Sequence, residues 1–339
     1  MEYTITTNNL KTLINGLIEG HTVYAPKRVG ATTVLYETIA SFDEYDSTVL
    51  LANTSAKGKI YPQCEKLFEF AKTIDGVELK ECEQIKESVI FGCRPCDAIG
   101  FSLLDKLFNW EEYRDESYFS RRDKTTIISI SCTNPESTCF CNSFENGGSA
   151  GKAGSDLLLT PIGDRYLVEI ITEKGQKIIE GSKYFEPATE KDVASKQGVE
   201  QAANEKMTKQ LELNEIKKNL DNAFESPYWD TVHLPCLKCN VCTFVCPTCY
   251  CFDISECPSG YAEGERNRTW DSCMSEPFTR MAGGVNPRSD PKRRFRQRFM
   301  HKFRYHVDNF NEHLCTGCGR CIKYCPVGID IRRVLEGVR

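Results

Sequence analysis

The sequence lacks any long hydrophobic run. No apolar stretch approaches the roughly 18 residues that a membrane helix requires, and no basic segment followed by an apolar one opens the chain. This pattern predicts a soluble, cytoplasmic protein whose 19 cysteines stay reduced. We therefore expect no direct membrane partner, and any membrane association would have to come through another protein.

The usual nucleotide-binding motifs are also missing. No GxGxxG fingerprint follows a predicted strand, and the glycine-rich segment 147–154 departs from the Walker spacing at Asn146 and Ala153. We expect this segment to be a surface loop. The five histidines show neither metal nor catalytic-triad spacing. The sequence therefore predicts no catalytic residue in this chain, and no flavin or dinucleotide bound through the usual fingerprint.

Cysteine, in contrast, is abundant and patterned. Segments 236–247 and 315–326 both read C-x2-C-x2-C-x3-C-P, as in bacterial ferredoxins, where three thiolates of a run hold one [4Fe–4S] cluster and the fourth reaches the other cluster. The first predicted ligand set is Cys236, Cys239, Cys242 and Cys325. The second is Cys315, Cys318, Cys321 and Cys246. Two identical runs fit neither zinc spacing nor a disulfide framework.

A third group of cysteines follows predicted strands. Continuous apolar runs at 48–52, 88–92 and 125–130 are typical of strands buried in a parallel sheet, and a helix capped by Asp97 lies between the last two. Such a β-α-β unit brings the residues after both strands to one sheet edge. The cysteines expected there are Cys96, Cys132, Cys139 and Cys141. Their spacing alone leaves a [4Fe–4S] cluster and zinc both open.

The fold class predicted is α+β. Residues 1–185 form a mixed α/β domain, 186–230 a helical linker, and 231–339 a mainly helical two-cluster ferredoxin-type domain with a basic insertion at 247–314. In the first domain we expect a helix from Asn8 or Asn9 to about Gly20, a strand at 23–26, and a hairpin of 166–171 with 177–179. Amphipathic helices are expected within 190–224.

The basic segment 288–306 carries eight Lys or Arg residues against the single acid Asp290. Its aromatic residues could stack on nucleic-acid bases. However, Phe295, Phe299 and Phe303 recur every fourth position, which favours a helix packed on the domain with its cations facing anionic clusters or an acidic partner. The net charge of −5 agrees with no nucleic-acid partner.

The remaining cysteines of this insertion are Cys249, Cys251, Cys257 and Cys273. They could form a further site, but their irregular spacing favours buried thiols that pack beside the clusters.

The whole chain resembles the β-type iron–sulfur subunits of soluble multi-subunit oxidoreductases. This family includes the β subunit of archaeal sulfhydrogenase, an NAD(P)-linked [NiFe] hydrogenase, and the iron–sulfur electron-transfer subunit of anaerobic sulfite reductase. Besides the two cysteine runs, the resemblance is carried by residues 91–97, 131–132, 139–141, 246–251, 270–273, 282–284 and 301–302.

This resemblance implies a third [4Fe–4S] cluster at Cys96, Cys132, Cys139 and Cys141. It also implies an electron-transfer component of a hetero-oligomer, which relays electrons between a partner that binds FAD and NAD(P) and a catalytic partner. That catalytic partner would belong to a hydrogenase-like or a flavin-based bifurcating or transhydrogenase complex. The corresponding role in anaerobic sulfite reductase is the alternative, and a self-contained flavin reductase or an iron–sulfur nucleic-acid-binding protein is less favoured.

Overall fold

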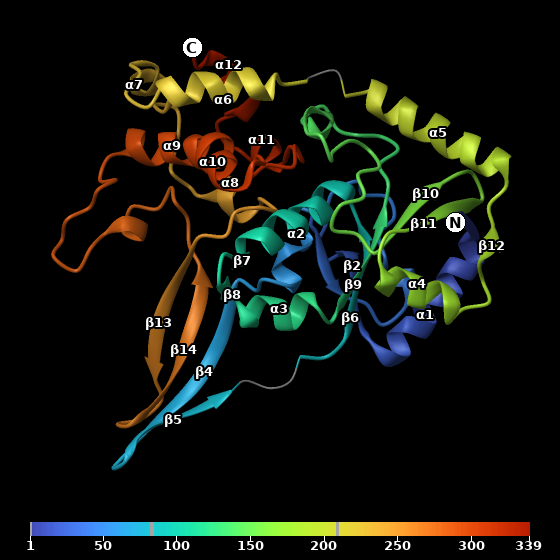
Figure 1. Cartoon of the computed structure of the whole chain (residues 1–339), viewed down its shortest axis with the longest axis horizontal. Coiled ribbons are helices and arrows are strands. Elements are labelled where there is room, and N and C mark those ends of the chain that lie inside the picture. The colour runs from blue at the N-terminus through green and yellow to red at the C-terminus, as the bar shows by residue number, and fades with distance from the viewer. Residues whose placement is uncertain (1, 82–84, 208–209) are drawn as a thin grey trace.

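An eight-stranded sheet is the centre of the first half of the chain in the computed structural model, which describes residues 2–81, 85–207 and 210–339 (Figure 1). The strand order is β12-β1-β11-β10-β9-β6-β2-β3. β2, β6, β9 and β10 are mutually parallel, whereas the outer pairs are antiparallel. The strands are β1 (Glu2–Thr6), β2 (Thr22–Arg28), β3 (Val34–Thr38), β6 (Ser88–Cys93), β9 (Thr125–Ile130), β10 (Leu157–Pro161), β11 (Arg165–Ile170) and β12 (Glu186–Pro187).

Helices α1 (Thr7–Gly20), α2 (Pro95–Leu107), α3 (Glu116–Arg122) and α4 (Glu173–Glu180) accompany this sheet. The predicted first helix is confirmed, although Thr6 rather than an asparagine caps it. The predicted β-α-β unit is also confirmed, because β6 and β9 are parallel neighbours joined through α2. Asp97 does not cap α2. The helix begins earlier, at Pro95, whose fixed backbone angle suits a first helical position.

Two predicted strands are wrong. Residues 48–52 form bends and turns, because the Arg94 guanidinium donates to the carbonyls of Val49 and Leu50 at 3.3 and 2.8 Å, where a strand would need ladder partners. Residues 177–179 lie inside helix α4, which the Thr172 side chain caps. The true hairpin partner of β11 is β10.

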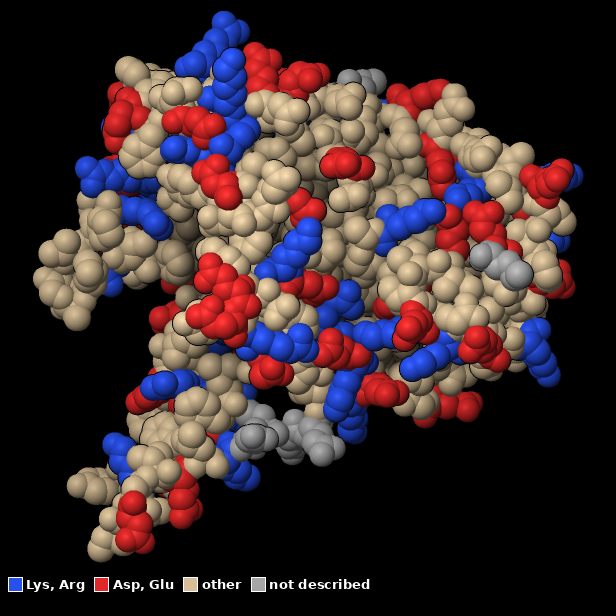
Figure 2. Space-filling model, viewed as in Figure 1, with Lys and Arg blue, Asp and Glu red and all other residues tan. Residues whose placement is uncertain are grey.

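A second sheet forms an arm that projects from the body of the protein (Figure 1). It has the order β13-β14-β4-β5 and consists of β4 (Cys64–Thr73), β5 (Gly76–Glu81), β13 (Phe252–Pro258) and β14 (Glu263–Trp270). Figure 2 shows acidic and basic side chains interspersed along it. None of these strands is predicted from the sequence. The arm joins a hairpin from the predicted first domain to one from the predicted cluster domain, while the domain boundaries themselves stay a prediction.

The C-terminal part of the described chain is mostly helical. Its core contains Trp229, Phe295, Phe299 and Phe303, all nearly fully buried. The aromatic residues at every fourth position therefore do form a packed helical face. The helices are α5 (Glu190–Glu205), α6 (Leu213–Asn222), α7 (Tyr228–Val232), α8 (Val241–Phe244), α9 (Pro291–Met300), the π-helical turn His301–Tyr305, α10 (His306–Phe310), α11 (Arg320–Lys323) and α12 (Ile331–Gly337). Among the described residues, no helix is long and apolar enough to cross a membrane.

Shorter elements complete the described chain. They are the strand pair β7 (Asn109–Trp110) and β8 (Tyr113–Arg114), and the 3-10 turns Phe42–Glu44, Ala56–Lys59, Cys141–Ser143 and Pro277–Thr279.

The glycine-rich segment 147–154 is a loop, as expected from the sequence, but it packs against the protein and is only partly exposed. A Cβ atom on Gly147 would lie 1.9 Å from the Cys141 carbonyl oxygen, and one on Gly154 would lie 1.9 Å from the Ala98 carbonyl oxygen. Ser149 between them is fully buried. The segment therefore packs its bare backbone between the loop of Cys141 and helix α2, which only glycine permits.

We expect Gly154→Ala to lower the free energy of unfolding by more than about 2 kcal/mol, because Gly154 has a left-handed φ of +79° and its new methyl group would meet the backbone of α2. Gly198→Ala is the matched control. Its Cβ, in helix α5, would meet nothing within 4 Å, so this change should leave stability unchanged or raise it by about 0.5–1 kcal/mol. Chemical denaturation of both variants measures the difference, and equal stability would contradict the proposed close packing.

Candidate metal centres

The first cysteine run and the end of the second surround one cavity. Its wall contains the predicted set Cys236, Cys239, Cys242 and Cys325, together with apolar side chains such as Phe295 and Phe299. Helix α8 carries Cys242, and the loop before it carries Cys236 and Cys239. Cys239 is exposed, so this cavity reaches close to the surface.

A second cavity is lined by Cys246, Cys315, Cys318 and Cys321. The structure therefore brings the fourth cysteine of the first run to three cysteines of the second, as the ferredoxin pattern requires. Cys246 and Cys318 are buried, and burial raises the pKa of the Cys318 thiol to about 11.

The two runs share an unusual backbone as well as a sequence pattern. Lys238 and Asn240 have φ angles of 60° and 63°, and the equivalent Gly317 and Gly319 have 65° and 75°. A Cβ on Gly317 would come within 2.5 Å of the Cys141 backbone nitrogen, and one on Gly319 within 2.5 Å of the Thr138 carbonyl oxygen. The second run requires glycine because it packs directly on residues 138–141.

The third cavity lies in that contact region. It is lined by Cys96, Cys132, Cys139 and Cys141, and also by Met207, whose Sδ lies 3.5 Å from the Cys141 Sγ. All four cysteines are buried. Cys96 stands in the first turn of α2, Cys132 just beyond β9, and the other two in the following loop, so the sheet edge does gather the cysteines that the sequence places there.

The three cavities follow one another through shared walls. Cys321 and Arg298 line both the first and the second, and Cys318 lines both the second and the third. The Phe140 backbone N–H, between two cysteines of the third cavity, donates to the Gly317 carbonyl at 2.9 Å. The sequence did not indicate which of the two ferredoxin-type sites adjoins the third.

Buried cations lie among these thiols. Lys302 Nζ is 3.4 Å from the Cys246 Sγ and also donates to Thr248 Oγ1 at 3.0 Å and the Leu314 carbonyl at 2.9 Å. Burial opposes its charge, but the sulfurs of Cys246, and then of Cys249 and Cys315, hold the pKa of the ammonium above its usual value. The lysine is therefore a fixed positive charge beside the second cavity.

Arg298 shows that the cavities suit an anionic group. Its Nε is buried and has no hydrogen-bond partner among the described residues, although the side chain lines two cavities. Burial opposes the guanidinium charge, yet the sulfurs of Cys242 and Cys321 keep its pKa well above the usual range. A [4Fe–4S] cluster ligated by four thiolates is anionic and offers sulfur acceptors, so four thiols beside such a donor fit it.

The arrangement of the thiols also bears on the nature of the metal. Among the residues that the structure describes, no group of three or more His, Cys, Asp or Glu side chains is placed to hold a single metal ion. Zinc would need four ligands converging at about 2.0–2.3 Å on one point. Each cavity gathers at least four cysteines in its wall, the number that one [4Fe–4S] cluster requires.

A buried ion pair joins the second and third cavities. Arg320 donates to both carboxylate oxygens of Asp97, at 2.5 and 2.8 Å, and to the Ala52 carbonyl at 2.9 Å. The Tyr36 hydroxyl donates to the same carboxylate at 3.2 Å. Asp97 follows Cys96 and Arg320 precedes Cys321 in sequence. This pair was not predicted from the sequence, although a charged residue stands beside a cysteine in each motif.

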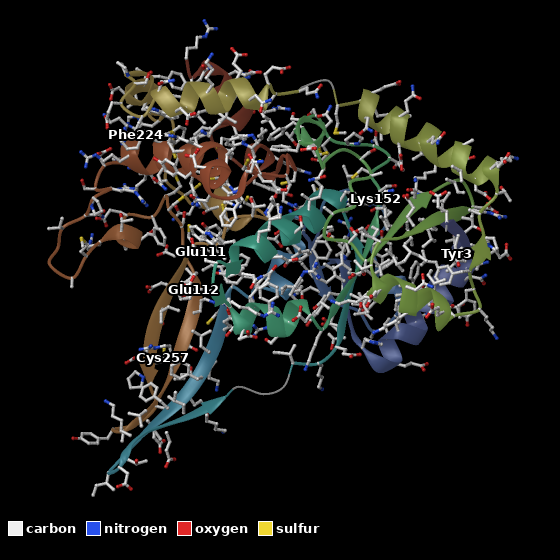
Figure 3. All side chains as sticks on the ribbon, viewed as in Figure 1. Tyr3, Glu111, Glu112, Lys152, Phe224 and Cys257 are labelled. Atoms are coloured by element: carbon white, nitrogen blue, oxygen red, sulfur yellow. The ribbon has the colours of Figure 1, made fainter. Side chains whose placement is uncertain are left out.

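The other described cysteines lie outside these cavities. Cys93 is buried at the end of β6, and Cys64 and Cys257 are exposed on the arm, where Figure 3 shows Cys257 on β13. Cys249, Cys251 and Cys273 form a separate group described below. Cys82 lies outside the described residues.

Comparisons with known proteins agree with this geometry. A family model described as a 4Fe-4S dicluster domain matches residues 235–329, which span both cysteine runs, so the chain is an iron–sulfur protein. It is also 33% identical over 331 residues to the sulfhydrogenase 2 subunit beta of Pyrococcus furiosus, a match that covers 96% of this chain and 94% of that protein. No solved structure gives a significant match. The chain belongs to the family of β-type iron–sulfur electron-transfer subunits, which confirms the resemblance stated above.

We expect Asp97→Asn to destabilise the protein by about 3–5 kcal/mol, because it leaves the buried Arg320 guanidinium without its counter-charge. Glu136→Gln is the control. Its pair with Lys323 is partly exposed, and its loss should cost no more than about 1 kcal/mol. Thermal unfolding of the anaerobically prepared protein compares the two variants, and a similar midpoint for both would show that the Asp97 pair does not hold the structure together.

Proposed function

We propose that this chain relays electrons within a hetero-oligomeric oxidoreductase, between a partner that binds flavin and NAD(P) and the catalytic component of a hydrogenase-like or flavin-based bifurcating or transhydrogenase complex. The observation that carries the proposal is the row of three thiol-lined cavities with shared walls. The homology to a sulfhydrogenase β subunit supports it.

In this proposal Cys236, Cys239, Cys242 and Cys325 hold the first [4Fe–4S] cluster, and Cys315, Cys318, Cys321 and Cys246 hold the second. Cys96, Cys132, Cys139 and Cys141 hold the third. Such clusters supply one-electron redox chemistry. The chain itself supplies the thiolates, excludes water with apolar walls, and balances negative charge with Lys302, Arg298 and Arg320.

The same proposal extends to the domain organisation. Residues 231–339 would be a two-cluster ferredoxin-type domain with an insertion at 247–314, and residues 1–185 a mixed α/β domain that contributes the third site. Helices α5 and α6 lie within the proposed linker 186–230. In support, the 4Fe-4S dicluster match falls within the proposed second domain.

The exposed end of the row is where a partner's redox centre could approach. Cys239 is exposed, as are the apolar side chains of Leu234 and Leu237 near it, whereas the four cysteines of the third site are all buried. Exposed apolar side chains beside a redox site are typical of a surface that another protein covers.

The electron-transfer role in anaerobic sulfite reductase is the alternative assignment, since the same row of sites would serve it. Purification of the intact complex under anaerobic conditions distinguishes the candidates. Nickel in the complex would indicate a hydrogenase, sirohaem a sulfite reductase, and neither metal centre a flavin-based complex. Flavin retained by the isolated chain would instead favour a self-contained reductase.

Nucleic-acid binding gains no support from the basic segment. Arg294, Arg296, Arg298 and Lys302 are all buried and therefore cannot reach a phosphate backbone. Figure 2 also shows acidic side chains interspersed with the basic ones over the helices drawn at upper left. If the protein shows no salt-sensitive binding to single-stranded or double-stranded nucleic acid, this function is excluded.

The number of clusters has a direct test. The anaerobically prepared chain should contain about twelve irons, and Cys96→Ser should reduce that to about eight, because it removes one ligand of the third site alone. Cys93→Ser, three residues away but outside the cavity wall, should leave the count at about twelve. An iron content of about eight in the unchanged protein would remove the third cluster from the proposal.

Lys302→Met should lower the midpoint potential of the cluster that Cys246 helps to hold. The ammonium lies 3.4 Å from the Cys246 sulfur, and a positive charge there favours the more negative, reduced state. A more exposed lysine in the second run, Lys323, provides the control, and its change to Met should leave the potential nearly unchanged because water screens it. A redox titration followed by electron paramagnetic resonance measures both, and an unshifted potential in Lys302→Met would contradict the assignment of Cys246.

A further inference from the structure

Three cysteines outside the proposed ligand sets form a group next to the second cavity, in which Cys273 is buried and Cys249 and Cys251 are half-buried. The Cys249 side chain lies beside that of Cys246, and the Cys251 side chain lies beside that of Cys273. Cys249 also lies within electrostatic range of Cys273. The three cysteines therefore form one group beside Cys246.

The fold brings the backbones that carry Cys251 and Cys273 close together. They lie just outside the paired ends of β13 and β14, where Phe252 is the register partner of Trp270. The Asp271 N–H donates to the Cys251 carbonyl at 2.8 Å, which continues the pairing past the last strand residues. The Ser272 hydroxyl accepts from Thr243 at 2.9 Å and from the Met274 N–H at 3.1 Å, so the turn that carries Cys273 is held on both sides.

The surroundings of this pair favour a thiolate. Lys57 is buried. Its Nζ donates to the Cys249 carbonyl at 2.5 Å and lies 3.7 Å from the centre of a Trp270 ring. Hydrogen bonding from Cys273 lowers the pKa of the Cys251 thiol to about 7 against the effect of burial, and the charges of Lys302 and Lys57 act in the same direction. Reactive cysteines occur in such electropositive and partly accessible settings, and Cys251 is only half-buried.

We propose that Cys251 and Cys273 are a redox-active dithiol that stores two electrons beside the iron–sulfur sites. On oxidation, both S–H bonds break, one S–S bond forms, two protons go to water, and two electrons leave. The electrons go singly to the iron–sulfur sites, and this destination rests on the function proposed above. Reduction is the reverse, in which two electrons and two protons convert the disulfide into two thiols.

The pair is distinct from the proposed cluster ligands. Neither Cys251 nor Cys273 lines any of the three thiol cavities. Two thiols in hydrogen-bond contact need only a further approach to reach the S–S bond length of about 2.0 Å. A dithiol therefore explains the pair better than a fourth metal site.

The first test locates the disulfide in the complete, anaerobically prepared chain. The protein is equilibrated in glutathione buffers from reducing to oxidising, free thiols are alkylated, and peptides are analysed by mass spectrometry. We expect the peptides of Cys251 and Cys273 to become linked with the loss of two hydrogens, at constant iron content. Alkylation of both thiols throughout, a link from either to Cys249, or a link that appears only as iron is lost would overturn the proposal.

Variants sharpen this result. Cys251→Ser and Cys273→Ser should each abolish the link without changing the iron content, whereas Cys257→Ser, which removes an exposed thiol of the arm, should leave the link intact (Figure 3). If a serine variant does not fold, the linked peptide of the unchanged protein still decides the question.

The second test counts electrons. A stoichiometric reductive titration of the oxidised, unchanged chain should consume two more electrons than the same titration of Cys273→Ser. Equal consumption would overturn the exchange with the iron–sulfur sites. A chain that forms the disulfide but contains no iron would instead refute the proposed electron relay and leave the dithiol itself standing, so the two failures are distinguishable.

Discussion

The buried ion pair between Arg320 and Asp97 is the constraint on which the arrangement of sites depends. A charge removed from water is tolerated only where an opposite charge and further hydrogen bonds satisfy it. Here the Asp97 carboxylate accepts from Arg320 and Tyr36, and the guanidinium reaches a backbone carbonyl as well. Because each partner adjoins a cysteine, this one contact fixes the second ferredoxin-type run against the β-α-β unit. The shared wall at Cys318 is a consequence.

Much of the central sheet could be predicted, because the buried strands are recognisable from their own residues. The runs at 88–92 and 125–130 are continuously apolar and do form buried parallel strands. The run at 48–52 has the same composition but is held in bends by Arg94, which lies 44 residues after Leu50, and no local pattern reveals this contact. The strands of the arm could not be predicted from the sequence for a related reason. Strands β4 and β14 are distant in sequence, and their pairing depends on tertiary contacts such as the buried Arg268 with Glu65, 203 residues apart.

The grouping of cysteines was more accessible to sequence reasoning than the environment of each group. Fixed spacing is a geometric statement about a loop, so the two ferredoxin-type groups could be predicted residue by residue, whereas the third group was expected from its position after two parallel strands. Which run adjoins the third site could not, because this follows from long-range contacts, such as the close packing of Gly317 and Gly319 on residues 138–141. Likewise, the pattern of Phe295, Phe299 and Phe303 predicts a buried helical face, but only the fold shows that Arg298 and Lys302 turn inward with it.

The inward orientation of the Arg298 and Lys302 side chains has an electrostatic consequence for the proposed relay. The middle cavity has two buried cations, Lys302 and Arg298, in its wall, whereas the first has one buried cation, Arg298, together with the exposed Lys238, and lies closer to solvent. Asp97 neutralises Arg320 between the second and third cavities, which leaves Arg94 as the buried cation that acts on Cys132 of the third. Buried positive charge favours the reduced state of an anionic redox centre. In the proposed relay, the strongest stabilisation of a reduced centre therefore falls in the middle of the row, next to the thiols of Cys249, Cys251 and Cys273, rather than at either end.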